Sequence, residues 1–280
     1  MDAGAWWVLL AGLAFAVPHV LLGFSPVRPR LAAALGEQGF VALFALVAAI
    51  GLAVLALALA RSGGGGAVPW GALPAVARGA LVLLAVVGLV LAFAALRAYP
   101  RSPSALFRSR VSAPRGIEKI SRHGFFVGFG AFAFAHTLLA REVAPALAFG
   151  VLGAVCAIGA LFQDRKLRAR HGEAWLEYAR QTSVLPGFAL LQGRTRLQPD
   201  DGLGAALARA AVATAVVAAL HALWAFGSGA GFVALLGLGG LAVSIRRFRG
   251  AAGGGPSISR RPSPQPGPAP SAPADDPPGP

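Results

Sequence analysis

The sequence contains one cysteine, Cys156, in 280 residues. A single thiol cannot form an internal disulfide, and it excludes the paired-cysteine motifs of zinc, redox and covalent haem sites. Charged residues are also scarce, at 13% against about 25% in an average soluble domain. Apolar residues make up 56% of the chain. This composition excludes a disordered chain, a soluble nucleic-acid-binding protein and a typical cytosolic enzyme, and it favours a polytopic membrane protein.

Acidic residues are few as well, with 11 Asp and Glu against 25 Lys and Arg, which gives a net charge of +14. The cations lie in segments between long apolar runs, so the positive-inside rule explains them better than a nucleic-acid partner does. Counted by segment, 21 cations fall on one side of the membrane and three on the other. This asymmetry predicts an outer N-terminus and a cytoplasmic C-terminus.

Seven apolar runs can form membrane spans, since a span needs about 20 residues. Backbone groups in lipid must pair within their own segment, so the runs are expected to be helices. We therefore expect an all-α membrane bundle with a five-span core and two further spans, the last of them short. The runs are 5–24, 40–60, 75–96, 125–140, 143–162, 203–226 and 230–245. The first run is expected to be a retained span, because a signal peptide carries Lys or Arg before its apolar run and none precedes this one.

The chain divides into three predicted parts. Residues 1–196 form the core membrane domain, and residues 197–248 add two spans. Residues 249–280 are rich in Pro, Gly and Ser and have few large apolar side chains. Such a segment cannot bury enough surface to offset its ordering entropy, so we expect a disordered cytoplasmic tail.

Histidines within the spans are the candidate functional residues, because polar groups are costly at membrane depth. His19 follows Pro18, which can break the helix, while His123 and His136 lie at the two ends of one span. An imidazole in such a place can ligate a metal or haem or transfer a proton. It can equally form a hydrogen bond between helices, or contact headgroups in the case of His123.

Residues 164–186 follow the fifth span and combine an apolar face with many cations. Trp175 and Tyr178 lie on that apolar face. The pattern predicts a helix on the membrane surface, with both rings at headgroup level. It is consistent with a lipid anchor, and also with a wall that binds a substrate entering from the cytoplasm.

Several short motifs occur in an order that resembles the NnrU family. The first span holds Phe15-Ala16-Val17-Pro18-His19, and Leu35-Gly36-Glu37-Gln38-Gly39 leads into the second. The next motif is Ser121-Arg122-His123, and His136 follows His123 by 13 residues. The last two motifs are Asp164-Arg165-Lys166 and, after it, Thr182-Ser183-Val184-Leu185-Pro186. The resemblance covers residues 5–194. One departure is Gly124, where the family pattern has proline after the histidine.

The resemblance implies a multi-pass protein of the bacterial inner membrane, linked to nitrogen-oxide metabolism or to isomerase-like chemistry on an apolar lipid or polyene. Plant relatives in this family are 15-cis-zeta-carotene isomerases, which use haem b. By this resemblance His19 and His136 match the two haem-iron ligands, and His123 matches a further family histidine. The sequence assigns no catalytic residue.

The positions of His19 and His136 along their spans give their expected depths in the membrane. His19 lies near the inner end of its span and His136 near the outer end of another, so straight helices would separate them by about 15 Å in depth. His19 and His123 are better matched in depth, and so are His136 and His221.

Two alternatives remain open from the sequence. The region around Asp164 is similar to S-adenosylmethionine-dependent membrane methyltransferases of the isoprenylcysteine and phospholipid type, although one acid stands where two are expected. The other alternative is a non-enzymatic assembly or transport helper whose histidines are structural.

Overall fold

A computed structural model describes residues 2–24, 27–103 and 110–224, and within these ranges the fold is helical. The long helices are α1 (Ala3–Phe24), α2 (Val27–Arg61), α3 (Ala75–Ala98), α5 (Gly124–Leu139), α6 (Val143–His171) and α9 (Leu203–Trp224). The short ones are α4 (Ile117–Ile120), α7 (Glu173–Gln181) and α8 (Phe188–Leu191), with 3-10 turns η1 (Tyr99–Arg101) and η2 (Pro199–Asp201).

The predicted all-α membrane bundle is confirmed. Five helices in the described part of the chain are long and apolar enough to cross a membrane, namely α1, α2, α3, α6 and α9. Helix α5 is also apolar but has only 16 residues. The seventh predicted run, 230–245, and the tail at 249–280 lie outside the described residues. The orientation of the bundle stays a prediction.

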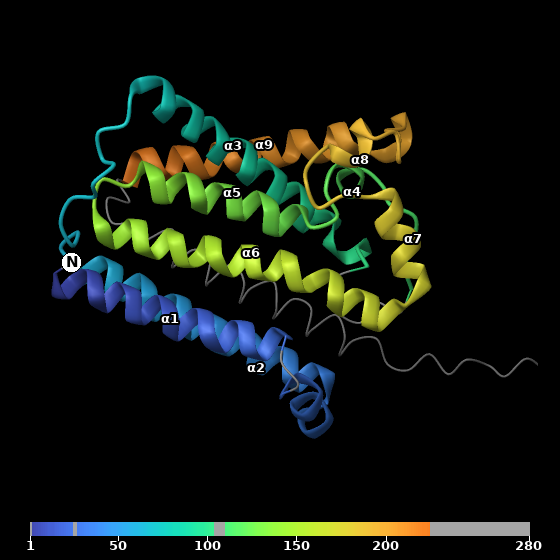
Figure 1. The fold of residues 1–280 in the computed structure, drawn as a ribbon, viewed down its shortest axis with the longest axis horizontal. Coiled ribbons are helices and arrows are strands. Elements are labelled where there is room, and N and C mark those ends of the chain that lie inside the picture. The colour runs from blue at the N-terminus through green and yellow to red at the C-terminus, as the bar shows by residue number, and fades with distance from the viewer. Residues whose placement is uncertain (1, 25–26, 104–109, 225–280) are drawn as a thin grey trace, which may run out of the picture.

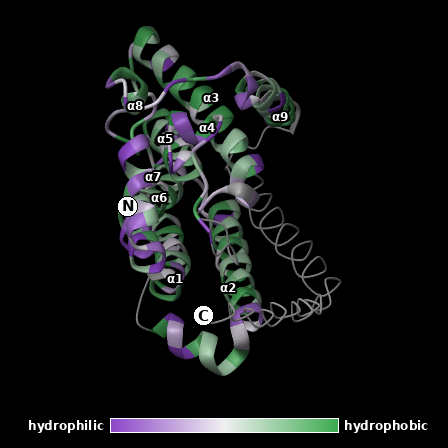
Figure 2. Ribbon diagram, turned by 90° about the vertical axis from the view of Figure 1, so that its right-hand side faces the viewer, coloured by the Kyte–Doolittle hydropathy of each residue, from purple (hydrophilic) through white to green (hydrophobic). Residues whose placement is uncertain are grey.

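The helices form a connected series in which α9, α3, α5, α6, α1 and α2 follow one another as neighbours (Figure 1). Short α5 therefore lies inside the series, between α3 and α6. Large apolar side chains such as Val76 and Leu83 on α3 and Leu161 on α6 are exposed. Figure 2 shows that hydrophobic residues cover much of these helices. An outer surface of this kind is suited to lipid rather than water.

Helices α3 and α5 meet at a contact between glycines. A Cβ placed on Gly88 would lie 2.5 Å from the carbonyl oxygen of Gly128, and the reverse distance is the same. On α5, Gly124 and Gly128 are spaced as G-x-x-x-G, and a Cβ on Gly124 would lie 3.0 Å from Ala95. Small residues at this spacing let helix backbones approach closely in membranes. This contact fixes the position of α5, and with it both of its histidines.

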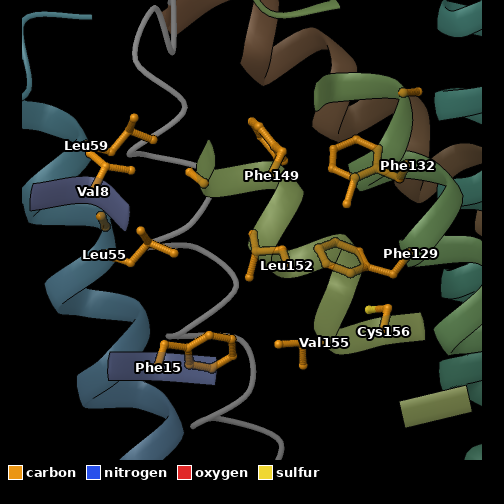
Figure 3. Close-up of a cluster of buried hydrophobic side chains, with 14 of the residues drawn as sticks. Val8, Phe15, Leu55, Leu59, Phe129, Phe132, Phe149, Leu152, Val155 and Cys156 are labelled. Atoms are coloured by element: carbon orange, nitrogen blue, oxygen red, sulfur yellow. The ribbon is translucent and has the colours of Figure 1, made fainter. Parts of the chain in front are cut away.

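The main apolar core lies between the α1–α2 pair and the α5–α6 pair (Figure 3). Val8 and Leu55 are fully buried there, and Phe15 approaches α2 at Gly51, where a Cβ would lie 3.0 Å from the Phe15 backbone. Cys156 is buried on the α6 side of the same cluster. The core thus packs α1 and α2 against α6 along one side of the bundle.

A helical segment that the sequence did not predict precedes the second span. Helical structure starts at Val27, and the chain turns sharply at Gly36, whose φ is 72° and ψ 161°. These dihedrals are accessible essentially to glycine alone. The turn folds residues 27–35 back toward the following helix, so that Arg28 reaches Glu37 at 3.3 Å and stands over the Phe40 ring. The Leu35–Gly39 motif is therefore a reversal that positions Arg28.

Candidate cofactor and substrate cavity

A cavity of about 360 Å³ opens among α1, α2, α3, α5 and α6, at the end of the bundle that carries α4. One part of its wall is apolar and largely aromatic, with Phe40, Phe44 and Phe126 among the lining residues. Another part is polar and carries the cations Arg28, Arg122 and Lys166. Its volume and mixed lining are typical of small-molecule sites.

His19 lines the apolar part of this cavity. Its ring contacts Phe15 and Phe44, with centroid distances of 5.1 and 4.7 Å. Its Nδ1 atom is buried and has no hydrogen-bond partner among the described residues. A buried nitrogen without a partner is costly, so Nδ1 is a candidate atom for binding a group held in the cavity.

His123 also lines the cavity, and its side chain is almost completely buried. Its Nε2 lies 2.5 Å from Oδ1 of Asp164. Arg122 holds the same carboxylate from the other side, with Nε 3.1 Å from Oδ1 and a terminal nitrogen on Oδ2. Because Asp164 is ionised between these two partners, Nε2 of His123 carries the proton and the ring orientation is fixed.

An extended segment after α7 is hydrogen-bonded to the two residues that precede His123. The backbone N–H of Arg122 donates to the Ser183 carbonyl at 2.9 Å, and its guanidinium donates to the Thr182 carbonyl at 3.2 Å. The Ser121 hydroxyl donates to the Val184 carbonyl at 2.7 Å. Three stretches that carry the family resemblance, around residues 121–123, 164–166 and 182–186, thus meet at one place.

The prediction for residues 164–186 needs correction. Helix α6 continues to His171, and α7 then packs back so that Trp175 and Tyr178 are buried against Leu167 rather than held at headgroup level. Trp175 stacks on the His123 ring at 6.3 Å. Burial, and then the neighbouring Glu118 carboxylate, raise the pKa of Tyr178 well above its usual value. The apolar face of α7 therefore forms the support behind His123, because these rings complete a small protein core.

His136 has a different environment. Its Nδ1 lies 3.0 Å from the carbonyl oxygen of Phe132, four residues earlier on the same helix. Its ring packs between Phe132 and Phe149, at centroid distances of 4.1 and 4.8 Å. His136 does not line the cavity that His19 and His123 share, within the described residues.

Contacts between α1 and α6 give the separation of His19 and His136 along the bundle. Gly65 contacts both Ala5 and Ala144, and Gly12 contacts Val151, so the two helices advance together. His19, seven residues after Gly12, is then level with residue 158, whereas His136 is level with Phe149. Nine residues correspond to about 13 Å along a helix. The structure brings His19 and His123 to one cavity, and it does not bring His19 and His136 together.

Two ion pairs that the sequence did not predict organise this end of the bundle. One is Arg122–Asp164, and the other joins Lys119 to Asp201 at 2.8 Å with both side chains buried. Lys119 also donates to the carbonyl of Arg196 at 2.9 Å, which ties α4 to the segment before α9. The only sign of these pairs in the sequence was the presence of single charged residues beside apolar runs. The positive-inside rule already explained the cations, so it gave no reason to expect ion pairs.

These observations define a polytopic all-α membrane protein with an internal cavity lined by two histidines. The chain belongs to the NnrU family, described as NnrU protein, whose profile matches residues 8–251. The match extends beyond the motifs at 5–194 and includes α9.

Two curated relatives are chloroplastic 15-cis-zeta-carotene isomerases. The chain is 35% identical to the one from Zea mays over 109 residues, which are 36% of this chain and 30% of the relative. It is 34% identical to the one from Arabidopsis thaliana over 110 residues, 37% of this chain and 29% of the relative. The chain thus matches about three tenths of the length of these relatives. No solved structure matches it.

Proposed function

We propose that this chain is a membrane isomerase for an apolar, polyene-like substrate and that it binds haem b in the cavity, with His19 as an iron ligand. The relatives named as isomerases of a carotene support the reaction class. The observation that carries the proposal is the buried, unpartnered Nδ1 of His19 at the cavity wall.

The chemical types of the residues that line the cavity suit haem b. His19 offers a free ring nitrogen among aromatic side chains, and Arg28 and Lys166 offer cations at the polar part of the same wall. Haem b bound here would supply iron-centred Lewis-acid and one-electron chemistry. The apolar wall excludes water and holds a hydrocarbon chain by burial.

We assign the handling of a proton in this cavity to His123. Its Nε2 proton is held by Asp164, which Arg122 in turn orients. This leaves Nδ1 as the nitrogen that can accept a proton, and the Trp175 stack limits rotation of the ring. With both Asp164 oxygens engaged by protein groups, the carboxylate offers little to a cofactor amine, which argues against the methyltransferase alternative.

The test is the visible spectrum of the protein purified in detergent and supplied with haem b. We expect a Soret band in the wild type, and its loss or displacement in His19→Ala. His136→Ala is the matched control, because it removes an imidazole from the same bundle but from another level. An unchanged Soret band in His19→Ala, or none in the wild type, ends the haem proposal.

The reaction is tested separately with 15-cis-zeta-carotene in proteoliposomes. Chromatography of the recovered isomers should show conversion by the wild type and at least a tenfold slower conversion by His123→Phe, which keeps a ring on Trp175 but removes the proton-handling nitrogens. No conversion by the haem-loaded wild type would contradict the proposed reaction.

A further inference from the structure

We propose that the polar part of the cavity binds the anionic group of an amphiphile, with Arg28 and Lys166 as the cations that receive it and the aromatic wall as the site for the apolar body. The inference deepens the proposed function, because it concerns the same cavity. The shared ligand chemistry is a carboxylate or phosphate attached to an apolar body. Two sources can supply it, namely a haem propionate or the head of an acidic lipid.

The position of Arg28 is the first observation. The Gly36 turn brings this residue back over Phe40, with the guanidinium carbon 5.2 Å from the ring centroid. Its side chain is only 23% exposed, and it lines the cavity. Glu37 holds it from the outer side, since that carboxylate is 55% exposed. Arg28 is thus held facing the cavity by a Gly-dependent turn, an aromatic ring and a carboxylate.

The local charge balance is the second observation. Lys166 lines the same cavity, and the charges of Arg28, Arg170 and Glu37 act on it. Three cations therefore share this region with one carboxylate. Like charges gathered at a partly desolvated wall repel one another, and an incoming anion relieves that repulsion. The positive-inside rule places cations at one end of a bundle, but it does not require them to line a cavity.

Two other charged residues, Arg122 and Glu118, also line the cavity. Arg122 is committed to Asp164 and to the Thr182 carbonyl. Glu118 accepts the backbone N–H of Arg115 and lies beside Tyr178. The anion is assigned to Arg28 and Lys166, because these two cations line the cavity and their charges act on each other there.

The apolar wall completes the site. Phe40 and Phe44 continue from the Arg28 side toward His19. A ligand that was hydrocarbon throughout would match only the aromatic part of this lining and would offer no negative charge to the two cations. An amphiphile satisfies both parts of the wall at once.

The experiment uses the full chain purified in a nonionic detergent. A dansyl-labelled fatty acid and its methyl ester are titrated against the wild type, Arg28→Gln, Lys166→Gln and the control Arg141→Gln, whose cation lies beyond the far end of α5. The wild type should bind the acid about tenfold more tightly than the ester, because a charge-assisted hydrogen bond is worth about that factor. Either cavity variant should lose this preference, and Arg141→Gln should keep it.

A second arm separates the two sources by titrating haem b and its dimethyl ester into the same variants. Weaker haem binding by Lys166→Gln, with ester binding unchanged, identifies the propionate as the anion. Loss of the fatty-acid preference without any effect on haem identifies a lipid head. Equal binding of acid and ester by the wild type, or variants that behave like Arg141→Gln, overturns the inference.

Failure of the haem proposal is recognised independently. His19→Ala without an effect on the Soret band ends that proposal, while an intact preference for acid over ester leaves the anion site standing. Two cavity variants are used so that misfolding of one does not decide the result. Folding is checked by the heat-induced exposure of Cys156 to a thiol-reactive dye, since this lone cysteine is buried in the folded chain.

Discussion

The two ends of α5 carry one histidine each, and their surroundings differ in kind. At the first end, His123 is joined to Asp164 on α6 and, through Arg122, to the segment after α7. At the other end, His136 bonds to the backbone of its own helix and packs between phenyl rings. The hydrogen bonds of the first arrangement join residues far apart in the sequence, whereas the hydrogen bond of the second lies within one helix. The comparison shows that a place at the end of a span does not by itself determine which groups a histidine contacts.

The largest expected effect comes from removing the carboxylate on which the first end depends. Asp164→Ala leaves the buried His123 ring and the Arg122 guanidinium without their shared acceptor. We expect a loss of about 2 kcal/mol in unfolding free energy, below the value for a fully buried pair because Asp164 is 31% exposed. Thermal unfolding followed by dye labelling of Cys156 measures it.

His136→Leu is the companion variant at the other end of the helix. It removes one local hydrogen bond and keeps an apolar side chain between Phe132 and Phe149. Its unfolding temperature should stay closer to the wild type than that of Asp164→Ala. An equal or larger loss at His136 would show that the two ends are not energetically distinct.

A substitution at Gly36 is expected to disturb the His123 end of the bundle through the backbone. Gly36→Ala places a Cβ where φ is 72° and ψ 161°, so we expect a cost of about 1–3 kcal/mol and displacement of Arg28. The control is Gly79→Ala, on an exposed turn of α3 with open space around the new Cβ, which should gain up to about 1 kcal/mol. The same unfolding assay compares them, and a neutral Gly36→Ala would mean that the turn is not strained.

The smallest expected effect is a pH dependence at the Lys119–Asp201 pair. Burial acts to raise the pKa of Asp201, but the Lys119 ammonium and nearby backbone N–H groups outweigh it and hold the pKa below its usual value. A lowered folded-state pKa means that this contribution to stability is complete above the unfolded value of about 4 and is lost as the pH falls through the folded value. The stability gap between wild type and Asp201→Asn should therefore narrow on acidification. Asp200→Asn, at the exposed neighbouring position, should show no such narrowing.

The apolar runs were sufficient to predict the helices, because a span in lipid must be long, apolar and internally hydrogen-bonded. They did not predict the turn at Gly36, since one glycine among many gives no local sign of its dihedral angles. The placement of Trp175 and Tyr178 was wrong for a related reason. An amphipathic face looks the same in sequence whether it covers lipid or protein.

The candidate site was predictable only in part. Span arithmetic placed His19 and His123 at similar depth, and the structure brings both to one cavity. The hydrogen-bond partners of His123 and Arg122 could not be predicted, because they are far away in the sequence. Asp164 is 41 positions from His123, and Thr182 is 60 positions from Arg122. Such pairings depend on how α6 and α7 fold back, which no local pattern encodes.

The glycine contact between α3 and α5 also bears on which helices can move apart. Gly88 and Gly128 meet backbone to backbone, and this close packing would be lost if α3 and α5 separated. Helix α2, by comparison, is held to the rest of the bundle chiefly through α1. If the cavity widens to admit a larger molecule, we expect α1 and α2 to move away from α6, because that requires no separation of α3 from α5.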